Sequence, residues 1–229
     1  MIRTNRLQLI SIHIPKTAGT SFRNTLKGVY GEHAVKRLDI DLIHQQLKVE
    51  QETFTEKKLP RGTKVIHGHF SYALLSQQLE ISPKTPVITW LRDPVERVIS
   101  NYHYLAKRLA AELNEEGKGL NILSKMQKTL LEYAYSELNR NRISKFMEGM
   151  SLSDCAFVGI TECYQQDLAS LSQLLNWKSY PNFHHNATGQ RPVVSEMERE
   201  VIRSWNQADM ALYEEALSLR QARIKAQVL

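Results

Sequence analysis

The sequence predicts an α/β protein with a mostly parallel central sheet, flanking helices and a helical C-terminal part. Two observations support this fold class. Short apolar runs at residues 9–14, 86–91 and 156–160 have the length of buried strands, and a shorter run lies at 64–67. Each run is followed by apolar residues at helical spacing. The carboxyl ends of parallel strands then share one edge of the sheet, where α/β proteins bind ligands.

Length and composition limit the possibilities further. The 229 residues fit one domain, 1–229, with a helical insertion around 106–150, and the 42% hydrophobic content is enough for a packed core. The net charge of +6 favours anionic partners. Two cysteines cannot build a disulfide framework or a zinc quartet. We find no signal-like N-terminus and no membrane span, so we expect a cytoplasmic protein.

The first apolar run ends in a loop that suits an anion. Pro15 stops the strand because it has no N–H for the ladder, and a helical pattern begins near Phe22. The start of that helix presents unpaired N–H groups and a positive dipole end, and Lys16 adds a full charge. An ordinary capped turn is the alternative. The candidate binding residues are Lys16, Thr17, Ala18, Gly19, Thr20 and Ser21.

This loop differs from the phosphate loop of kinases and GTPases. That loop requires GxxxxGK[ST], with the lysine just before the hydroxyl residue. Here Lys16 comes first and Gly19 is the only glycine. The sequence therefore predicts a phosphate-type group that is bound without an obligatory metal.

Two histidines follow the run at 64–67. His67 and His69 are two residues apart, so in an extended chain they would share a face. They are structural histidines, a metal pair, or a pair that includes a general base. A metal needs further ligands, and no nearby Asp, Glu or Cys supplies them. Histidine suits proton removal from an alcohol near neutral pH.

The third run ends in a basic residue beside a helix start. Asp93 is the expected N-cap, Pro94 the first helical residue and Glu96 the third. Arg92 then lies at the carboxyl edge of the sheet, where its planar fork suits a phosphate, and Ser100 can add a hydroxyl. The alternative is that Arg92 only pairs with Asp93 or Glu96.

The remaining segments carry weaker signals. Thr161 directly follows the fourth strand. Arg191 lies in a loop-like segment at 180–192, for which an ordinary surface loop is the alternative. We expect a short helix over 39–47, a helix opened by a capping box at Ser195, and a second helix from about residue 207.

Three motifs together resemble one known family. Residues 15–21 (PKTAGTS), 67–69 (HGH) and 92–102 (RDPVERVISNY) are similar to motifs of sulfotransferases that use 3′-phosphoadenosine 5′-phosphosulfate (PAPS). The closest likeness is to the heparan/dermatan sulfate 2-O-sulfotransferase group, and the segment at 158–162 (VGITE) adds a shorter match. The resemblance implies a P-loop-like nucleotide-binding fold. Because this chain has no membrane anchor, the resemblance indicates a bacterial-type enzyme.

The resemblance also assigns roles. It implies that the loop from Lys16 to Ser21 holds the 5′-phosphosulfate, and that Arg92 and Ser100 hold the 3′-phosphate. His69 would be the catalytic base and His67 a substrate contact. Lys16 would also be catalytic, because it stabilises the charge on the leaving phosphate. By the same resemblance, Thr161 would contact the nucleotide, and Arg191 would belong to a loop that closes over the nucleotide and its phosphate.

We therefore predict a sulfotransferase that moves the sulfuryl group of PAPS to a hydroxyl acceptor, a saccharide. The second product is 3′,5′-adenosine bisphosphate (PAP), and no metal is required. The alternatives are a metal-dependent, kinase-like phosphotransferase and a non-catalytic polyanion-binding protein. No nucleic-acid-binding motif is present, so we expect no nucleic-acid partner.

Overall fold

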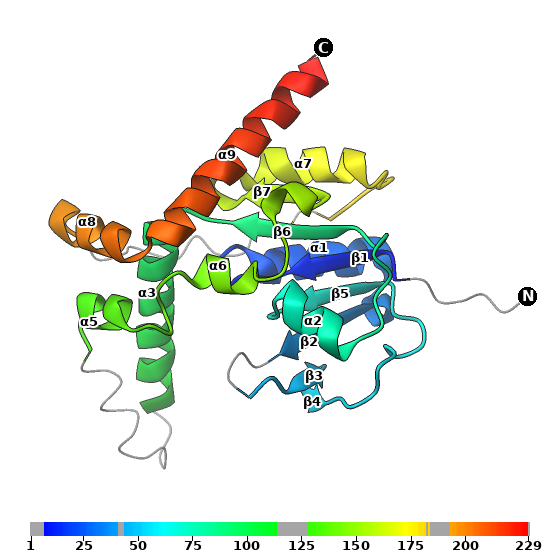
Figure 1. Cartoon of the computed structure of the whole chain (residues 1–229), viewed down its shortest axis with the longest axis horizontal. Helices are drawn as coiled ribbons and strands as arrows, with labels where there is room; N and C mark the ends of the chain where they lie inside the picture. The colour runs from blue at the N-terminus through cyan, green and yellow to red at the C-terminus, as the bar shows by residue number, and fades with distance from the viewer. Residues whose placement is uncertain (1–6, 41–43, 114–127, 182, 184–192, 229) are drawn as a thin grey trace, which may run out of the picture.

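The computed structural model describes residues 7–40, 44–113, 128–181, 183 and 193–228. Within them a seven-stranded sheet has the order β4-β3-β2-β5-β1-β6-β7 (Figure 1). Its strands are β1 (Leu9–Ile12), β2 (Val35–Ile40), β3 (Leu47–Val49), β4 (Glu52–Thr53), β5 (Val65–Gly68), β6 (Val87–Leu91) and β7 (Phe157–Ile160). The five strands from β2 to β7 in this order pair in parallel, and β3 and β4 add an antiparallel edge. The predicted fold class is confirmed.

The helices of the described residues pack on both faces and at one end of this sheet. They are α1 (Gly19–Tyr30), α2 (Tyr72–Gln78), α3 (Pro94–Leu113), α5 (Leu130–Tyr135), α6 (Arg142–Phe146), α7 (Tyr164–Leu174), α8 (Glu196–Trp205) and α9 (Gln207–Val228). Three short 3₁₀ helices are η1 (Glu32–Ala34), η2 (Leu152–Asp154) and η3 (Thr161–Cys163). None of the described helices is both long and apolar enough to cross a membrane.

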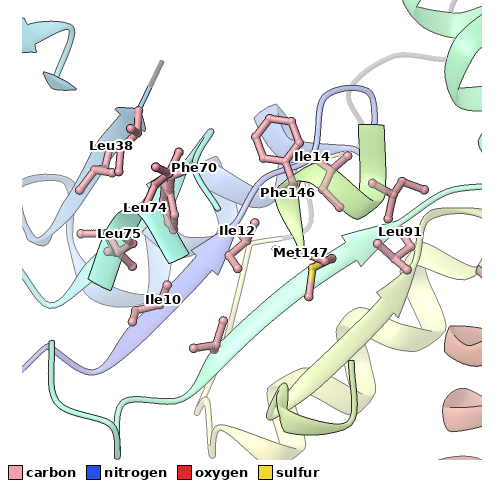
Figure 2. Packing of buried hydrophobic residues seen from close by; sticks show 14 of the residues in the cluster. Ile10, Ile12, Ile14, Leu38, Phe70, Leu74, Leu75, Leu91, Phe146 and Met147 are labelled. Atoms are coloured by element: carbon pink, nitrogen blue, oxygen red, sulfur yellow. The ribbon is translucent and has the colours of Figure 1, made fainter. Parts of the chain in front are cut away.

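The strands bury both faces, as parallel strands covered by helices must. On one face, Leu9, Ile88 and Phe157 pack with residues of α1 and α7. On the other, Ile10 and Ile12 pack with residues of α2, α6 and α9 (Figure 2). A third cluster joins α3, α5 and α8 beyond the end toward which the strand arrows point (Figure 1).

The predicted helix over 39–47 is wrong. β2 occupies Val35–Ile40 and pairs antiparallel with β3, so that Leu38 lies opposite Val49 and Ile40 opposite Leu47. These four side chains are buried in the core. The helical spacing was a weak signal over so few residues, and pairing with the sheet edge buries the same apolar residues in extended chain.

The chain connectivity places the candidate site. From β1 the chain passes through α1 to β2 on one side of the sheet, whereas β6 and β7 lie on the other side. The strand order therefore reverses between β1 and β6. In open α/β sheets, ligands bind in the crevice at the carboxyl ends of two such strands. The loops after β1 and β6 carry Lys16 and Arg92.

Candidate active site

The β1–α1 loop (residues 13–18) is held in a strained conformation. Lys16 and Ala18 have positive φ angles, 74° and 61°, in a region that costs a non-glycine residue about 1–2 kcal/mol. Thr17 Oγ1 donates a hydrogen bond to the carbonyl of Ile14 (2.8 Å) and is buried. The hydroxyl of Thr17 therefore holds the loop together. Strain that the surrounding structure maintains is typical of ligand-binding loops.

The first turn of α1 is open to an anion. Ala18 is the N-cap and makes no side-chain cap, and the first turn contains no acidic residue. By contrast, Ser71 caps α2, and Ser195 with Glu198 forms the predicted capping box of α8. Gly19 and Ser21 are buried and Thr20 is exposed. The backbone N–H groups of this turn are therefore available as anion donors.

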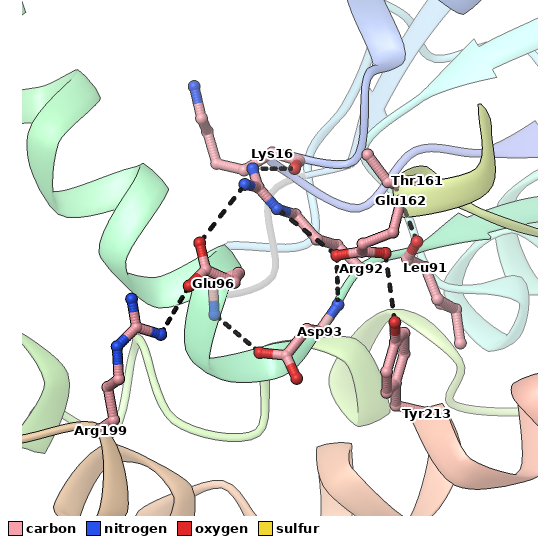
Figure 3. Close-up of polar contacts among 9 residues, drawn as sticks. All are labelled: Lys16, Leu91, Arg92, Asp93, Glu96, Thr161, Glu162, Arg199 and Tyr213. Atoms are coloured by element: carbon pink, nitrogen blue, oxygen red, sulfur yellow. Dashed lines mark hydrogen bonds and ion pairs between the residues drawn. The ribbon is translucent and has the colours of Figure 1, made fainter. Parts of the chain in front are cut away.

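Arg92 reaches the β1–α1 loop from the end of β6. Its Nη1 donates to the carbonyl oxygen of Lys16 at 3.4 Å (Figure 3). It forms long ion pairs with Glu96 (3.8 Å) and Glu162 (3.9 Å). Asp93 instead caps α3, because its Oδ1 accepts from the Glu96 N–H at 2.9 Å. The predicted pairing of Arg92 with Glu96 is thus present, and it leaves Arg92 at the loop.

Both carboxylates beside Arg92 have closer donors elsewhere. Glu96 accepts from Arg199 at 2.6 Å. Glu162 accepts from the Asp93 N–H at 3.1 Å and from the Tyr213 hydroxyl at 3.2 Å (Figure 3). These carboxylates are tied to α8, α3 and α9. The site edge is therefore braced by the C-terminal helices as well as by the sheet.

One face of α3 looks toward the loop. Glu96, Ser100 and Tyr104 are four residues apart and share this face. Glu96 contacts Arg92, and the Tyr104 ring lies 4.1 Å below the Lys16 ammonium. Ser100, which is buried, therefore lies on this face between Glu96, which contacts Arg92, and Tyr104, which contacts Lys16. The side chain of Lys16 points away from the Arg92 guanidinium (Figure 3).

Thr161 joins the same edge. It begins η3 directly after β7, and its Oγ1 donates to the Leu91 carbonyl at 2.8 Å (Figure 3). Leu91 is the last residue of β6 and precedes Arg92. Thr161 therefore links the carboxyl ends of β6 and β7.

The two predicted histidines meet a third one, His13 of the β1–α1 loop. The His13 ring stacks on His67 (centroids 5.0 Å apart) and on His69 (4.4 Å). We call His67, His13 and His69 the histidine stack. Gly68 is required between the two outer members, because a Cβ there would lie 1.8 Å from the Leu38 carbonyl oxygen. The strand β5 thus approaches β2 closely where it delivers its histidines.

Hydrogen bonds fix the two outer rings. His69 Nδ1 lies 2.8 Å from the carbonyl oxygen of His13, which can only accept. In the neutral ring the proton is therefore on Nδ1, and Nε2 has the free lone pair. His67 Nδ1 lies 2.9 Å from Ser11 Oγ, and among the described residues its buried Nε2 has no hydrogen-bond partner.

Burial keeps the histidine stack neutral. It lowers the pKa of His67 to about 3, with a further lowering from His69. Burial also lowers the pKa of His13 well below 6.5. The pKa of His69 is lowered mainly by burial, against the opposing effects of the His13 carbonyl and Asp39. A neutral His69 with an unprotonated Nε2 can accept a proton.

The predicted site residues thus come together at one edge. Lys16 and Arg92 are in contact, and His69 reaches the same loop through His13. His67 is 3% exposed, so its contact with a substrate stays a prediction. Arg191 lies outside the described residues.

Sequence reasoning missed several residues of this edge. His13 lies between Ile12 and Ile14, so it was interpreted as part of the strand. The available signal was a titratable ring two residues before Pro15. Tyr104 could have been found from its spacing of four residues from Ser100. Glu162 and Tyr213 could not, because the pairing of β7 with β6 brings Glu162 to Arg92, and the packing of α9 brings Tyr213 to Glu162.

The surroundings of the site add two facts. A hollow of about 260 Å³ lies between α2 and α6 and is lined by Leu74, Gln77, Lys145 and Glu148, among others, but by none of the predicted site residues. The Phe146 ring of α6 lies 6.1 Å from the His69 ring between centroids, and its neighbour in sequence, Lys145, lines the hollow. In the described part of the chain, no three His, Cys, Asp or Glu side chains are grouped to hold a metal ion.

The sequence of the chain matches one known protein family. The model of a family described as "Sulfotransferase family" matches residues 1–214. No curated protein shows significant similarity to the chain. A sulfotransferase from Alicyclobacillus acidocaldarius is a structural neighbour with 14% sequence identity and a TM-score of 0.48. The alignment covers 93% of this chain and 96% of the neighbour's chain.

Two other solved structures are similar at the same level. Mouse sulfotransferase SULT7A1, solved with PAP, has 12% sequence identity and a TM-score of 0.46. The alignment covers 89% of this chain and 65% of the mouse chain. The sulfotransferase domain from the curacin biosynthetic pathway has 10% identity and a TM-score of 0.43, with 92% and 97% covered.

Proposed function

The chain belongs to the sulfotransferase family, and on that premise we propose that it transfers the sulfuryl group of PAPS to a hydroxyl acceptor with His69 as base. One observation carries the proposal. Lys16, Arg92 and His69 come from three different strand ends, and all lie around the carboxyl end of β1. That edge combines groups that bind an anion with a neutral ring that accepts a proton.

The donor fits the cationic side of this edge. The first turn of α1 and the β1–α1 loop offer backbone N–H groups to the 5′-phosphosulfate. Arg92 and Ser100 hold the 3′-phosphate, and Thr161 and Arg191 contact the nucleotide. Arg92 suits this role because its ion pairs with Glu96 and Glu162 are long, so a phosphate can replace them at small cost.

The reaction then needs one proton transfer. Nε2 of His69 takes the proton of the acceptor hydroxyl, the oxygen forms a bond to sulfur, and the bond from sulfur to the phosphate oxygen breaks as PAP leaves. Lys16 and the loop N–H groups stabilise the charge that grows on the leaving phosphate. As in phosphoryl transfer, positioning and electrostatics supply most of the catalysis.

The acceptor belongs on the other side of His69. Phe146 of α6 flanks the ring, and the preceding residue, Lys145, lines the hollow between α2 and α6. Gln77, Lys145 and Glu148 line this hollow and can bond hydroxyl groups. We propose a saccharide hydroxyl, because the His67–His69 segment resembles the 2-O-sulfotransferase group. His67, which is buried, is then a substrate contact or a helper of the base.

The helical insertion is also part of the proposal. We propose that residues 1–229 act as one domain, in which segment 106–150 is added to the sheet. The separate apolar cluster between α3, α5 and α8 supports this division.

Two measurements test the function. Thermal unfolding with PAP, AMP and ATP should show the largest stabilisation by PAP, because only a 3′-phosphate reader prefers it. Labelled PAPS should then lose its sulfuryl group to at least one member of a panel of saccharides and small alcohols, with or without a metal chelator. Equal stabilisation by all three nucleotides, or turnover abolished by the chelator, would contradict the proposal.

A further inference from the structure

We propose that His13 is a positioning residue that couples the β1–α1 loop to the base His69. This inference rests on the proposed function, which makes His69 the base. His13 is the one member of the histidine stack that belongs to the anion-binding loop rather than to the β5 end. Its ring contacts the start of α1 and stacks on both other histidines.

The contact with α1 is direct. A Cβ added to Gly19, the first residue of α1, would lie 1.9 Å from His13 Nε2 and about as close to two ring carbons. The imidazole thus fills the space that any larger residue at position 19 would need. Because Gly19 belongs to the turn that presents N–H groups to the donor, the ring cannot move without disturbing that turn.

The contact with the base has two parts. The carbonyl of His13 accepts from His69 Nδ1, and the His13 ring stacks on His69 at 4.4 Å with an interplanar angle of 29°. The hydrogen bond selects the tautomer, and the stack fixes the plane of the ring. Together they set the direction of the free Nε2 lone pair relative to the loop. Phe146 supports the ring from its edge.

His13 itself is placed to orient rather than to exchange protons. Its ring stacks on both His67 and His69, and Gly19 packs against the same ring near Nε2. The charges that face His69 come from other elements. Asp39 of β2 accepts a hydrogen bond from the His69 backbone N–H, and the charges of Arg37 on β2 and Arg142 on α6 lower the pKa of His69. Neutral His13 adds no charge to this balance.

The test compares His13→Ala with His13→Phe, and uses exposed His33→Ala as the matched control. His13→Ala removes the ring but keeps the carbonyl, whereas His13→Phe restores a stacking ring without nitrogens. We expect His13→Ala to lower kcat about 10- to 100-fold, since a displacement of about 1 Å can cost 10²-fold. PAP affinity should change less than about threefold. His13→Phe should recover most of the turnover, and His33→Ala should match the parent.

The pH profile separates positioning from general damage. Without the His13 ring, water reaches His69 and its pKa rises toward 6.5. The acidic limb of the kcat profile should therefore move to higher pH in His13→Ala and stay in place in His13→Phe. Full turnover in His13→Ala, or a folded His13→Phe that is as slow as His13→Ala, would overturn the proposal.

A measurement on the unmodified protein keeps the test independent of folding and of sulfuryl transfer. Imidazole ¹⁵N NMR should show the His69 proton on Nδ1, as the bond to the His13 carbonyl requires. A proton on Nε2 would overturn the inference even if transfer is observed. If the Nδ1 proton is found but PAP does not stabilise the protein, the proposed function has failed and not the positioning.

Discussion

Two groups of residues lie on either side of β1, and they differ in charge. On the β6 side, Arg92 forms ion pairs with Glu96 and Glu162, whose side chains are only partly buried, and Lys16 adds a second cationic side chain. On the β5 side, desolvation lowers the pKa values of the histidine stack, in which His67 is buried and His13 and His69 are half-buried. The same sheet edge therefore combines cationic side chains with neutral rings that can accept a proton. Desolvation has this effect because burial penalises the charged form of an imidazole.

The largest effect should come from His69. His69→Ala removes the proton acceptor, and a positioned base contributes about 10²–10⁴-fold to turnover. PAP affinity should stay within about twofold, because the donor is held on the other side of β1. Initial rates with labelled PAPS and calorimetric titration with PAP measure the two quantities. Equal losses of turnover and PAP affinity would mean that proton transfer and donor binding are not separated between the two sides of β1.

Arg92 should show the opposite pattern. Arg92→Ala should weaken PAP binding about 10- to 100-fold, since hydrogen bonds to charged groups contribute about 1.5–3 kcal/mol. AMP, which lacks the 3′-phosphate, should bind the variant and the parent about equally. Arg203→Ala, at a surface ion pair with Glu200 on α8, is the control. If Arg92→Ala weakens AMP as much as PAP, Arg92 supports the loop and does not read the 3′-phosphate.

The buried side makes a prediction about stability against pH. The pKa of His67 is about 3 in the folded protein and about 6.5 in the unfolded chain. The unfolded state therefore binds one more proton between these values, so stability falls as the pH drops below about 6.5. The slope is about 1.4 kcal/mol per pH unit for this residue. Urea unfolding at pH 5 and pH 7 should show a smaller difference for His67→Gln, and an unchanged difference would contradict the assignment.

The smallest effect concerns Tyr104. Its ring holds the Lys16 ammonium, and a partly exposed contact of this kind contributes about 0.5–1 kcal/mol. If Lys16 must leave the ring to reach the donor, Tyr104→Ala should tighten PAP binding by about two- to fivefold. Tyr104→Phe keeps a ring and should bind like the parent. Weaker binding by Tyr104→Ala would mean that the ring itself contacts the nucleotide.

Local signals were sufficient for much of the fold and part of the site. Pro15, the apolar run before it and the helical spacing after it indicated the strand, loop and helix around Lys16. Asp93 and Pro94 indicated the start of α3 in the same way. The segment 39–47 was misread because a short amphipathic stretch suits a helix and a strand equally, and only pairing with a neighbouring strand decides between them.

The sequence by itself determined the alternation of strands and helices and the residues at the strand ends, because spacing, proline and capping act within a few residues. Only the tertiary structure decided that His13 lies between His67 and His69, and that Glu162 and Tyr213 brace Arg92. Those contacts join residues about 50 to 70 positions apart in the sequence, and they form only when the sheet order and the packing of α9 are complete. Burial, which sets the charge of the histidine stack, is likewise a property of the packed molecule and not of the local chain.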